Sequence, residues 1–192
     1  MDKETLSATL QAILLTAKGP VTLPAPSEAL DDRKLEVETI REALESIGSD
    51  WDRPESGIRL EKVADGWRCV TPPELDPYLT AYHGLAAKQR LSQAGLEVLA
   101  VIAHRQPVTL PEINFIRGTN SASVVRTLLD RRLLKMAGRK KVVGKPFLYR
   151  TSKEFLLHFG LERPGDLPDP EELVKDDMVE AGSPVSEEDD LQ

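Results

Sequence analysis

The chain has few of the side chains that build disulfides, metal sites and thiol active sites. Its 192 residues include a single cysteine, Cys69, and only three histidines. One cysteine cannot form a disulfide within the chain, and His83, His104 and His158 lack the close spacing of metal ligands. Cys69 stands in a strand-like stretch without a neighbouring histidine or acid, which favours a packed or half-buried thiol. We therefore expect neither a metal site nor a catalytic cysteine.

The sequence also lacks the patterns of membrane spans, secretory leaders and common catalytic loops. No apolar run reaches the roughly 18 residues of a membrane span, and no charged and apolar leader is present. A glycine-rich phosphate loop after a strand and the Gly-x-Ser-x-Gly motif are absent as well. These absences predict a cytoplasmic protein without catalytic residues and without a cofactor.

Charge is distributed unevenly along the chain. Residues 1–84 hold 9 basic and 16 acidic side chains, residues 85–160 hold 14 and 4, and residues 161–192 hold 2 and 12. A basic middle between acidic ends predicts that the middle binds an anionic partner, either nucleic acid or an acidic protein segment. The acidic end is able to compete for the same surface.

The hydrophobic pattern of residues 1–84 predicts helices followed by a hairpin. Apolar residues at helical spacing indicate three helices, over residues 6–17, 26–32 and 37–48. Apolar and polar residues then alternate on both sides of the Asp65-Gly66 pair. This pair predicts a tight turn, because both positions of such a turn need positive φ. Three helices followed by a two-stranded wing is the order of a winged helix.

The same order recurs in the second part of the chain. Three further helices are expected, over residues 96–105, 110–117 and 120–131, followed by two strand-like runs around an Arg- and Lys-rich turn. Thr109 and Glu112 fit a capping box, since each side chain can satisfy a free amide of the other residue. Thr151 and Glu154 fit a second box before a final helix. A supersecondary unit used twice predicts two similar domains in tandem.

The predicted fold class is therefore α+β and mainly helical, with two tandem winged-helix domains and a disordered acidic C-terminal tail. The domains are placed at residues 1–84 and 92–161, with a linker over 85–91 and the tail over 162–192. Disorder is expected in the tail because its few apolar residues bury too little area to offset chain entropy.

Chemistry alone leaves two kinds of partner open. The helix over 120–131 has the position that reads DNA in helix-turn-helix proteins, and Asn120 and Arg126 lie near its start. The wing turn adds lysines that suit phosphate contacts without sequence information, namely Lys140, Lys141 and Lys145. Base-reading residues are sparse, however. A winged-helix transcription regulator and a module that binds an acidic protein both remain possible, because a fold does not determine a function.

A more specific signal comes from a set of positions within residues 92–161. The set comprises Leu99 to Thr109, Glu112-Ile113, Ile116 to Ser121, Leu128 to Arg131, Gly138-Arg139, Gly144 to Tyr149, Thr151, Phe155 and Phe159 to Leu161. It resembles the signature of segregation and condensation protein B, a family of subunits of bacterial SMC complexes. A weaker, collinear likeness covers residues 5–82. The sequence departs from the family at Arg132, where a glycine is common, and at His104 and Lys145, where tyrosine and arginine are usual.

The resemblance implies a homodimer, paired mainly through its N-terminal winged helix. It implies that the dimer binds the central segment of the kleisin and, through the kleisin, the SMC ATPase. The family is not enzymatic, and its role is chromosome condensation and segregation during cell division, near the nucleoid. Weak and non-specific DNA contact is compatible with that role.

Kleisin contacts are then expected from the C-terminal winged helix. Arginine suits such an interface because its planar fork holds carboxylates or carbonyls through two bonds, and the candidates are Arg105, Arg117, Arg126 and Arg139. Asn120 joins them, and Tyr149 and Phe155 are the expected aromatic anchors if the core does not bury them. For Arg117 and Arg139, a role within their own domain stays equally open.

Overall fold

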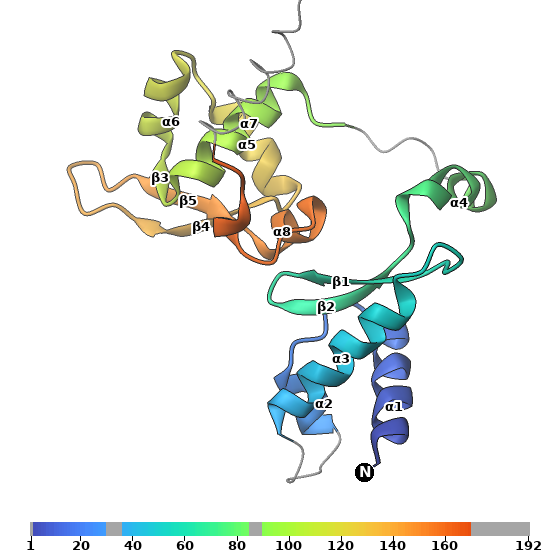
Figure 1. Ribbon diagram of the computed structural model, residues 1–192. Coiled ribbons are helices and arrows are strands. Elements are labelled where there is room, and N and C mark those ends of the chain that lie inside the picture. The colour runs from blue at the N-terminus through green and yellow to red at the C-terminus, as the bar shows by residue number, and fades with distance from the viewer. Residues whose placement is uncertain (1, 30–35, 85–89, 170–192) are drawn as a thin grey trace, which may run out of the picture.

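The computed structural model describes residues 2–29, 36–84 and 90–169, which form two halves joined by a connector (Figure 1). We call residues 2–84 the first half and residues 90–169 the second half. In each half, helices come first and an antiparallel hairpin follows, as in a winged helix. The predicted α+β fold is confirmed. Most of the predicted linker and the predicted tail from residue 170 onward lie outside the described residues.

The first half has one apolar core between its helices and its hairpin. Its elements are α1 (Lys3–Thr16), α2 (Pro24–Ala29), α3 (Val37–Trp51), β1 (Arg59–Val63) and β2 (Gly66–Val70). Leu10 of α1 and Leu44 of α3 are among the buried residues at its centre. The helix α3 continues to Trp51, beyond the end predicted at Gly48, because Gly48 keeps helical backbone and lies beside Leu60 of β1.

The hairpin turn lies one residue earlier than predicted. Ala64 and Asp65 occupy the turn with φ of 49° and 58°, whereas Gly66 is already the first residue of β2. The glycine is needed for a close approach instead, since a Cβ there would lie 3.0 Å from both Pro20 Cβ and the Val21 carbonyl oxygen. Val21 pairs with the next residue of β2 through hydrogen bonds of 2.8 and 2.9 Å. Gly66 therefore lets the loop after α1 join the hairpin.

Gly66→Ala is expected to lower the free energy of unfolding by about 1–3 kcal/mol, because the added methyl group overpacks this contact. Gly57→Ala is the matched control, since nothing lies within 4 Å of a Cβ at that position. Urea unfolding of the two variants measures the difference. Equal stability of the two variants would contradict the close approach.

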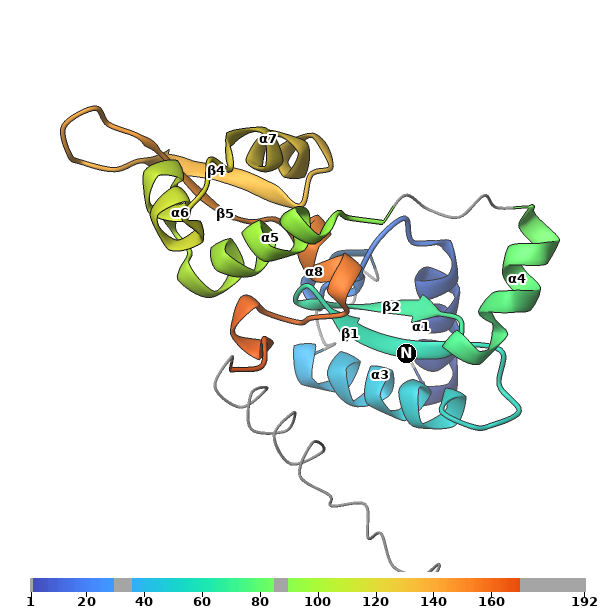
Figure 2. The ribbon, with the colours of Figure 1, turned by 90° about the horizontal axis from the view of Figure 1, so that it is seen from above.

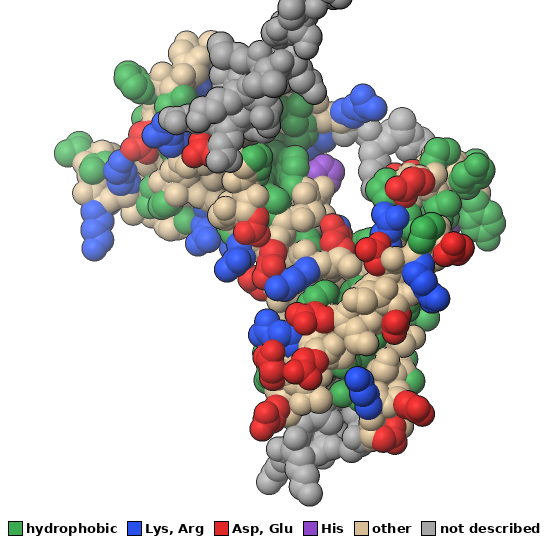
Figure 3. Space-filling view, in the orientation of Figure 1, with side chains coloured by type: hydrophobic (Ala, Val, Ile, Leu, Met, Phe, Trp, Pro, Cys, Tyr) green, Lys and Arg blue, Asp and Glu red, His purple; other side chains and the backbone are tan. Residues whose placement is uncertain are grey.

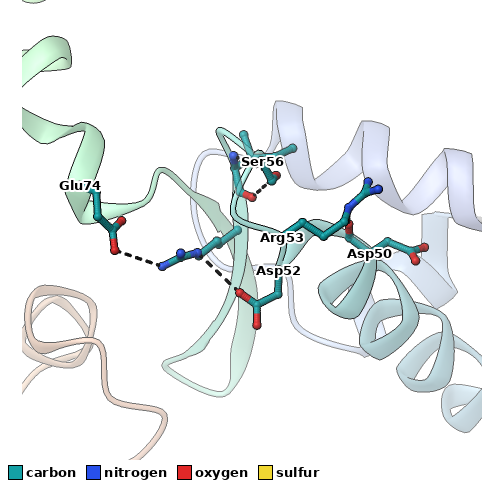
Figure 4. Close-up of polar contacts among 7 residues, drawn as sticks. Asp50, Asp52, Arg53, Ser56 and Glu74 are labelled. Carbon is teal, nitrogen blue, oxygen red and sulfur yellow. Dashed lines mark hydrogen bonds and ion pairs between the residues drawn. The ribbon is translucent and has the colours of Figure 1, made fainter.

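The chain leaves the hairpin through the turn η1 (Pro73–Leu75) and the helix α4 (Asp76–His83). Arg59 of β1 ties η1 to the rest of the first half, because its guanidinium forms ion pairs with Asp52 at 3.6 Å and with Glu74 at 3.9 Å (Figure 4). The helix α4 has no buried residue, and Tyr78 and Tyr82 on it are 73% and 84% exposed. Its aromatic side chains thus remain accessible to a partner.

The second half repeats the arrangement with one additional strand. Its elements are α5 (Gln93–Arg105), β3 (Val108–Thr109), α6 (Leu110–Arg117), α7 (Ala122–Asp130), β4 (Leu134–Arg139), β5 (Phe147–Thr151) and α8 (Lys153–Phe159). The three strands form an antiparallel sheet in the order β3-β5-β4. The helices α5 and α7 contribute Val98, Ile102 and Leu128 to a core in which all three are fully buried.

The helix α8 begins with a cap that differs from the predicted one. Ser152 is the N-cap, and its hydroxyl accepts a hydrogen bond from the Phe155 amide at 3.1 Å. Thr151 is still the last residue of β5, and both its amide and its hydroxyl donate to Gln106 Oε1, at 2.8 and 2.9 Å. The box predicted for Thr151 and Glu154 is wrong, because strand pairing holds Thr151 outside the helix.

The hairpin of the first half packs into the second half. Val63 and Ala64 at its tip are 0% and 5% exposed and belong to the core of the second half. The Ala64 amide donates to the Leu161 carbonyl at 2.9 Å, and the Arg68 guanidinium donates to the Leu157 carbonyl at 3.0 Å. Figure 2 shows α8 beside this hairpin. These contacts hold the two halves in one arrangement.

The folded part of the second half extends beyond residue 161. Pro164–Asp166 forms the turn η2, and Leu161 and Leu167 pack against the core of the second half. Residues 162–169, which the predicted tail included because it has few apolar residues, are folded here, since Leu167 covers apolar area of the core. Within the described residues, no helix is long and apolar enough to cross a membrane.

Candidate partner-binding surface

The charge segregation of the sequence reappears on the surface. Acidic side chains gather over α1 to α3 of the first half, and lysines and arginines are prominent on the second half (Figure 3). The cationic groups of the second half differ, however, in whether the fold already uses them. That difference separates arginines that are free for a partner from arginines that hold the domain together.

Arg117 and Arg139 are engaged within the second half. Arg117 of α6 forms an ion pair with Glu97 of α5 and donates to a carbonyl of α5 at 3.3 Å, and its side chain is only 16% exposed. Arg139 donates to the Lys145 carbonyl at 3.0 Å, and its guanidinium carbon lies 3.8 Å from the centre of the Phe147 ring. The geometry favours a role within their own domain for both arginines.

Arg105 and Arg126 are placed differently. Arg105 is the last residue of α5, Arg126 lies on α7, and both are exposed. Among the described residues, neither forms a hydrogen bond or an ion pair. Their guanidiniums are therefore free to hold carboxylates or backbone carbonyls of another chain.

An apolar groove that the sequence analysis did not identify lies next to Arg105. It has a volume of about 430 Å³, and its lining includes Pro107, Pro111, Phe115 and Ile116. Phe115 is 87% exposed and Ile116 is 50% exposed. An aromatic ring that water surrounds in the free protein gains the most when a partner buries it, which is the property of interface anchors. We call these residues, with Arg105, the α6 groove.

The helical spacing of α6 contained the signal for Phe115. Ile113 is the buried residue of this helix, and Phe115 follows it by two positions. Two positions correspond to about half a helical turn, so Phe115 has to lie on the opposite side. Ile116, three positions after Ile113, is half exposed and belongs to the groove as well.

The remaining candidates have mainly structural roles. Asn120 Oδ1 accepts a hydrogen bond from the Ala122 amide at 3.0 Å and so stabilises the start of α7. Tyr149 is half-buried against the core. Phe155 is 2% exposed, and its ring centre lies 4.7 Å from that of Phe159. Phe155 was expected to contact the partner only if the core did not bury it, and the core takes up its whole ring.

The outer face of the wing retains free positive charge. Lys141 and Lys145 are exposed in the turn between β4 and β5. Lys135 and Arg150 lie directly opposite each other on these strands, and both are exposed. Like charges opposite each other destabilise a sheet. An anion bound at this face would relieve the repulsion.

Glu112 links the capping box to the wing. Its carboxylate accepts hydrogen bonds from the Thr109 amide at 2.8 Å and the Thr109 hydroxyl at 2.6 Å, which confirms the predicted box. It also accepts a hydrogen bond from Lys140 Nζ at 2.5 Å. The ammonium of Lys140, followed by the bonds from Thr109, lowers the pKa of Glu112 to about 2. Lys140 is thus less available for nucleic acid than Lys141 or Lys145.

Glu112→Gln is expected to lower the free energy of unfolding at pH 7 by about 1 kcal/mol, as for a carboxylate at a helix N-terminus. The loss should shrink as the pH falls from the unfolded value of 4.5 toward about 2, because protonation then removes the same charge from the native protein. Urea unfolding of wild type and Glu112→Gln across this pH range measures the difference in stability.

Glu154→Gln is the matched control for this experiment. Glu154 also lies in a first helical turn, and the described residues give it no hydrogen bond or ion pair. It should change the stability by a few tenths of a kcal/mol, as is usual for surface sites. A stability difference between wild type and Glu112→Gln that persists unchanged at pH 2 would contradict the assignment.

The groups considered for metal binding or thiol chemistry are not brought together. Within the described residues, no cluster of histidine, cysteine and acidic side chains is arranged to hold a metal ion. Cys69 lies half-buried on β2, as predicted, and burial raises the pKa of its thiol. The arrangement on the second half suits the binding of an apolar and acidic chain: an exposed aromatic residue, a groove and free guanidiniums.

Comparison with known proteins decides the family. The family model described as "Segregation and condensation complex subunit ScpB" matches residues 8–170. The chain belongs to the ScpB family. Segregation and condensation protein B of Syntrophotalea carbinolica is 39% identical over 175 residues, which cover 91% of this chain and 87% of the relative. The resemblance drawn from residues 92–161 is therefore confirmed.

Two solved structures of ScpB proteins are also similar. The crystal structure of ScpB from Mycobacterium tuberculosis is 33% identical and covers 84% of this chain and 98% of its own, with a TM-score of 0.41. A dimer of a ScpB N-terminal domain complexed with ScpA peptide is 22% identical and covers 41% of this chain and 95% of its own, with a TM-score of 0.38. Membership of the family rests on the sequence match. A ScpB-family protein serves chromosome segregation and condensation, and a transcription regulator is not favoured.

Proposed function

We propose that this protein is a non-enzymatic subunit that binds the kleisin of a bacterial SMC complex in the cytoplasm and reaches the SMC ATPase through it. The observation that carries the proposal is the family match over residues 8–170. The curated relatives share the name segregation and condensation protein B, which describes a role in chromosome maintenance. A subunit of such a complex acts by contact, so its exposed surfaces matter most.

The α6 groove is the part of the second half that best fits the kleisin. Phe115 supplies a large apolar side chain at 87% exposure, and the groove beside it offers apolar walls. Arg105 adds a guanidinium that the described part of the chain leaves unused. Interfaces obtain most of their energy from a few such anchors, with arginine and aromatic residues prominent among them. An amphipathic, acidic kleisin segment has the matching chemistry.

The first half is proposed to form the homodimer. It presents several exposed apolar side chains that its own core does not use, namely Leu15, Val37, Tyr78 and Tyr82. Its acidic surface, with 16 acidic against 9 basic residues over 1–84, does not seek the same partner as the basic second half. The division into residues 1–84 for pairing and 92–161 for the kleisin follows from this contrast.

Weak DNA contact at the wing is a minor part of the proposal. Lys141 and Lys145 are exposed, and the opposed Lys135 and Arg150 favour an anion at the same face. These side chains suit phosphates and carry no sequence information. Any such contact is therefore expected to be indifferent to sequence and sensitive to salt.

Co-purification tests the proposed function. The full chain is expressed with the kleisin of the same organism, and the mass of the purified complex is measured in solution. A complex that contains two copies of this chain supports both the partner and the homodimer. Tight binding to one defined DNA sequence without binding to the kleisin would overturn the proposal, because it is the behaviour of a regulator.

Arg105→Ala and Arg126→Ala are each expected to weaken binding of the central kleisin segment by about 1–3 kcal/mol, as for hydrogen bonds to charged groups. The melting temperature should not change, because the described fold makes no use of either guanidinium. Calorimetric titration measures the affinity. Arg41→Ala in the first half, where Arg41 pairs with Glu38 at 3.2 Å, is the control. Wild-type affinity in both test variants would place the partner elsewhere.

A further inference from the structure

A second apolar hollow lies on the second half, apart from the residues of the α6 groove. It lies between the start of α5 and the ends of α7 and α8, and its volume is about 530 Å³. We call it the α5–α8 hollow. Its apolar lining consists of Leu91, Leu96, Leu133 and Phe159. Leu96 and Phe159 are 44% and 43% exposed. Much of this apolar area therefore remains open to water in the described chain.

The charge around this hollow distinguishes it from the α6 groove. Arg90, Arg131 and His158 complete its lining, and none of the described residues that line it is acidic. A smaller hollow of about 250 Å³ shares Arg90 and Arg131 and extends along α7. The α6 groove, by contrast, includes Glu112 beside Arg105. An apolar segment rich in carboxylates thus has the chemistry that matches the α5–α8 hollow.

The chain itself contains a segment with this chemistry. Residues 170–192 hold nine acidic side chains and one basic side chain, with Leu173-Val174 and Met178-Val179 as apolar pairs among them. The segment follows directly on Asp169, and Leu167 just before it packs against the core of the same half. A segment joined to its binding surface by a few residues has an effective concentration of about millimolar. Even weak contacts then suffice for docking.

We propose that the α5–α8 hollow is the docking site of the chain's own acidic segment, residues 170–192. The apolar pairs of the segment cover Leu96 and Phe159, and its carboxylates lie near Arg90 and His158. A docked segment would shield part of the positive charge of the second half, which holds 14 basic and 4 acidic residues over 85–160. The inference is independent of kleisin binding.

A spin label tests the proposal in the full chain. Cys69→Ser removes the single native thiol, and Met178→Cys then places the label within the acidic segment. In NMR spectra, the amide signals of Leu96 and Phe159 are expected to lose most of their intensity, because the label lies close to them. The amide signal of Phe115 in the α6 groove is expected to keep its intensity. Undiminished signals at Leu96 and Phe159, or equal loss at Phe115, would overturn the proposal.

Two further samples test whether the carboxylates drive docking and whether the docked segment belongs to the same chain or to a second copy. A chain of the same length in which Glu171, Glu172, Asp176, Asp177 and Glu180 are replaced by their amides should regain the signals, because it lacks the complementary charge. Mixing isotope-labelled chains without spin label and spin-labelled chains without isotope separates docking in one chain from docking between copies. A loss in the mixture, where label and isotope are on different chains, as large as the loss in the doubly labelled chain would assign the hollow to a second copy and overturn the proposal.

Discussion

Phe115→Ala is expected to weaken binding of the central kleisin segment by about 2–4 kcal/mol, which is roughly a 30- to 700-fold increase in Kd. The side chain is 87% exposed in the free protein and lies beside the α6 groove. Its burial by the partner contributes to binding and hardly to folding. The melting temperature should therefore stay within the range of an ordinary surface substitution. Calorimetric titration of full-length protein measures the affinity.

Val143→Ala is the matched control for Phe115→Ala. Val143 is an exposed apolar residue of the same half, but it lies in the wing turn and is not among the residues that line the groove. It should leave the affinity unchanged. Full affinity of Phe115→Ala would show that the kleisin does not use the α6 groove, and the exposed aromatic residues of α4 would then become the next surface to test.

Phe155→Ala is expected to lower the free energy of unfolding by about 3–5 kcal/mol, because it leaves a cavity in a packed core. Phe155 is 2% exposed and belongs to the cluster that also holds Val63 from the first half. For a chain of this length, such a loss lowers Tm by about 6–20 °C. Thermal unfolding followed by circular dichroism measures the shift.

Phe159→Ala is the control for this second substitution. Its ring contacts Phe155 but is 43% exposed, so its removal should cost clearly less stability. Kleisin affinity of Phe155→Ala, measured well below its melting temperature, should remain close to wild type. A stable Phe155→Ala protein that no longer binds the kleisin would restore the original prediction that Phe155 is a partner contact.

The turn between α7 and β4 contains Arg132, one of the positions at which this sequence departs from its family. Arg132 has a φ of 59°, a left-handed conformation that suits the glycine common in the family. For a residue with a Cβ this conformation costs about 1–2 kcal/mol. The Arg132 carbonyl accepts a hydrogen bond from the Ser152 hydroxyl at 2.5 Å, and this contact helps to hold the turn. The chain therefore keeps the turn without the glycine.

The order of helices and hairpins could be predicted from the sequence because its signals are local. Apolar residues at helical spacing indicated α1, α3, α5 and α7, and the box of Thr109 and Glu112 marked the start of α6. A cap or a helical stripe depends on residues within a few positions of one another. The family signature could also be recognised from the sequence, since most of its positions lie in one stretch of 70 residues, 92–161.

Errors at the element ends arose where a distant segment decides the local backbone. Asp65-Gly66 looked like the turn, but Val21 needs the space at Gly66 and the turn moves to Ala64 and Asp65. Thr151 looked like a cap, but it is paired in β5 and bonded to Gln106. In both cases a partner 45 residues away competes successfully with the local preference.

By itself, the sequence determined the class of fold, the duplication and the charge segregation, because composition and short-range periodicity carry all three. It also determined the family, because a set of signature residues within 92–161 carries the resemblance. Which arginines are free was decided only in the tertiary structure, where Arg117 meets Glu97 and Arg105 meets nothing in the described chain. The fate of the aromatic side chains was decided there too. Phe155 is buried and Phe115 is exposed, because burial depends on which surfaces of other elements come to lie against each ring.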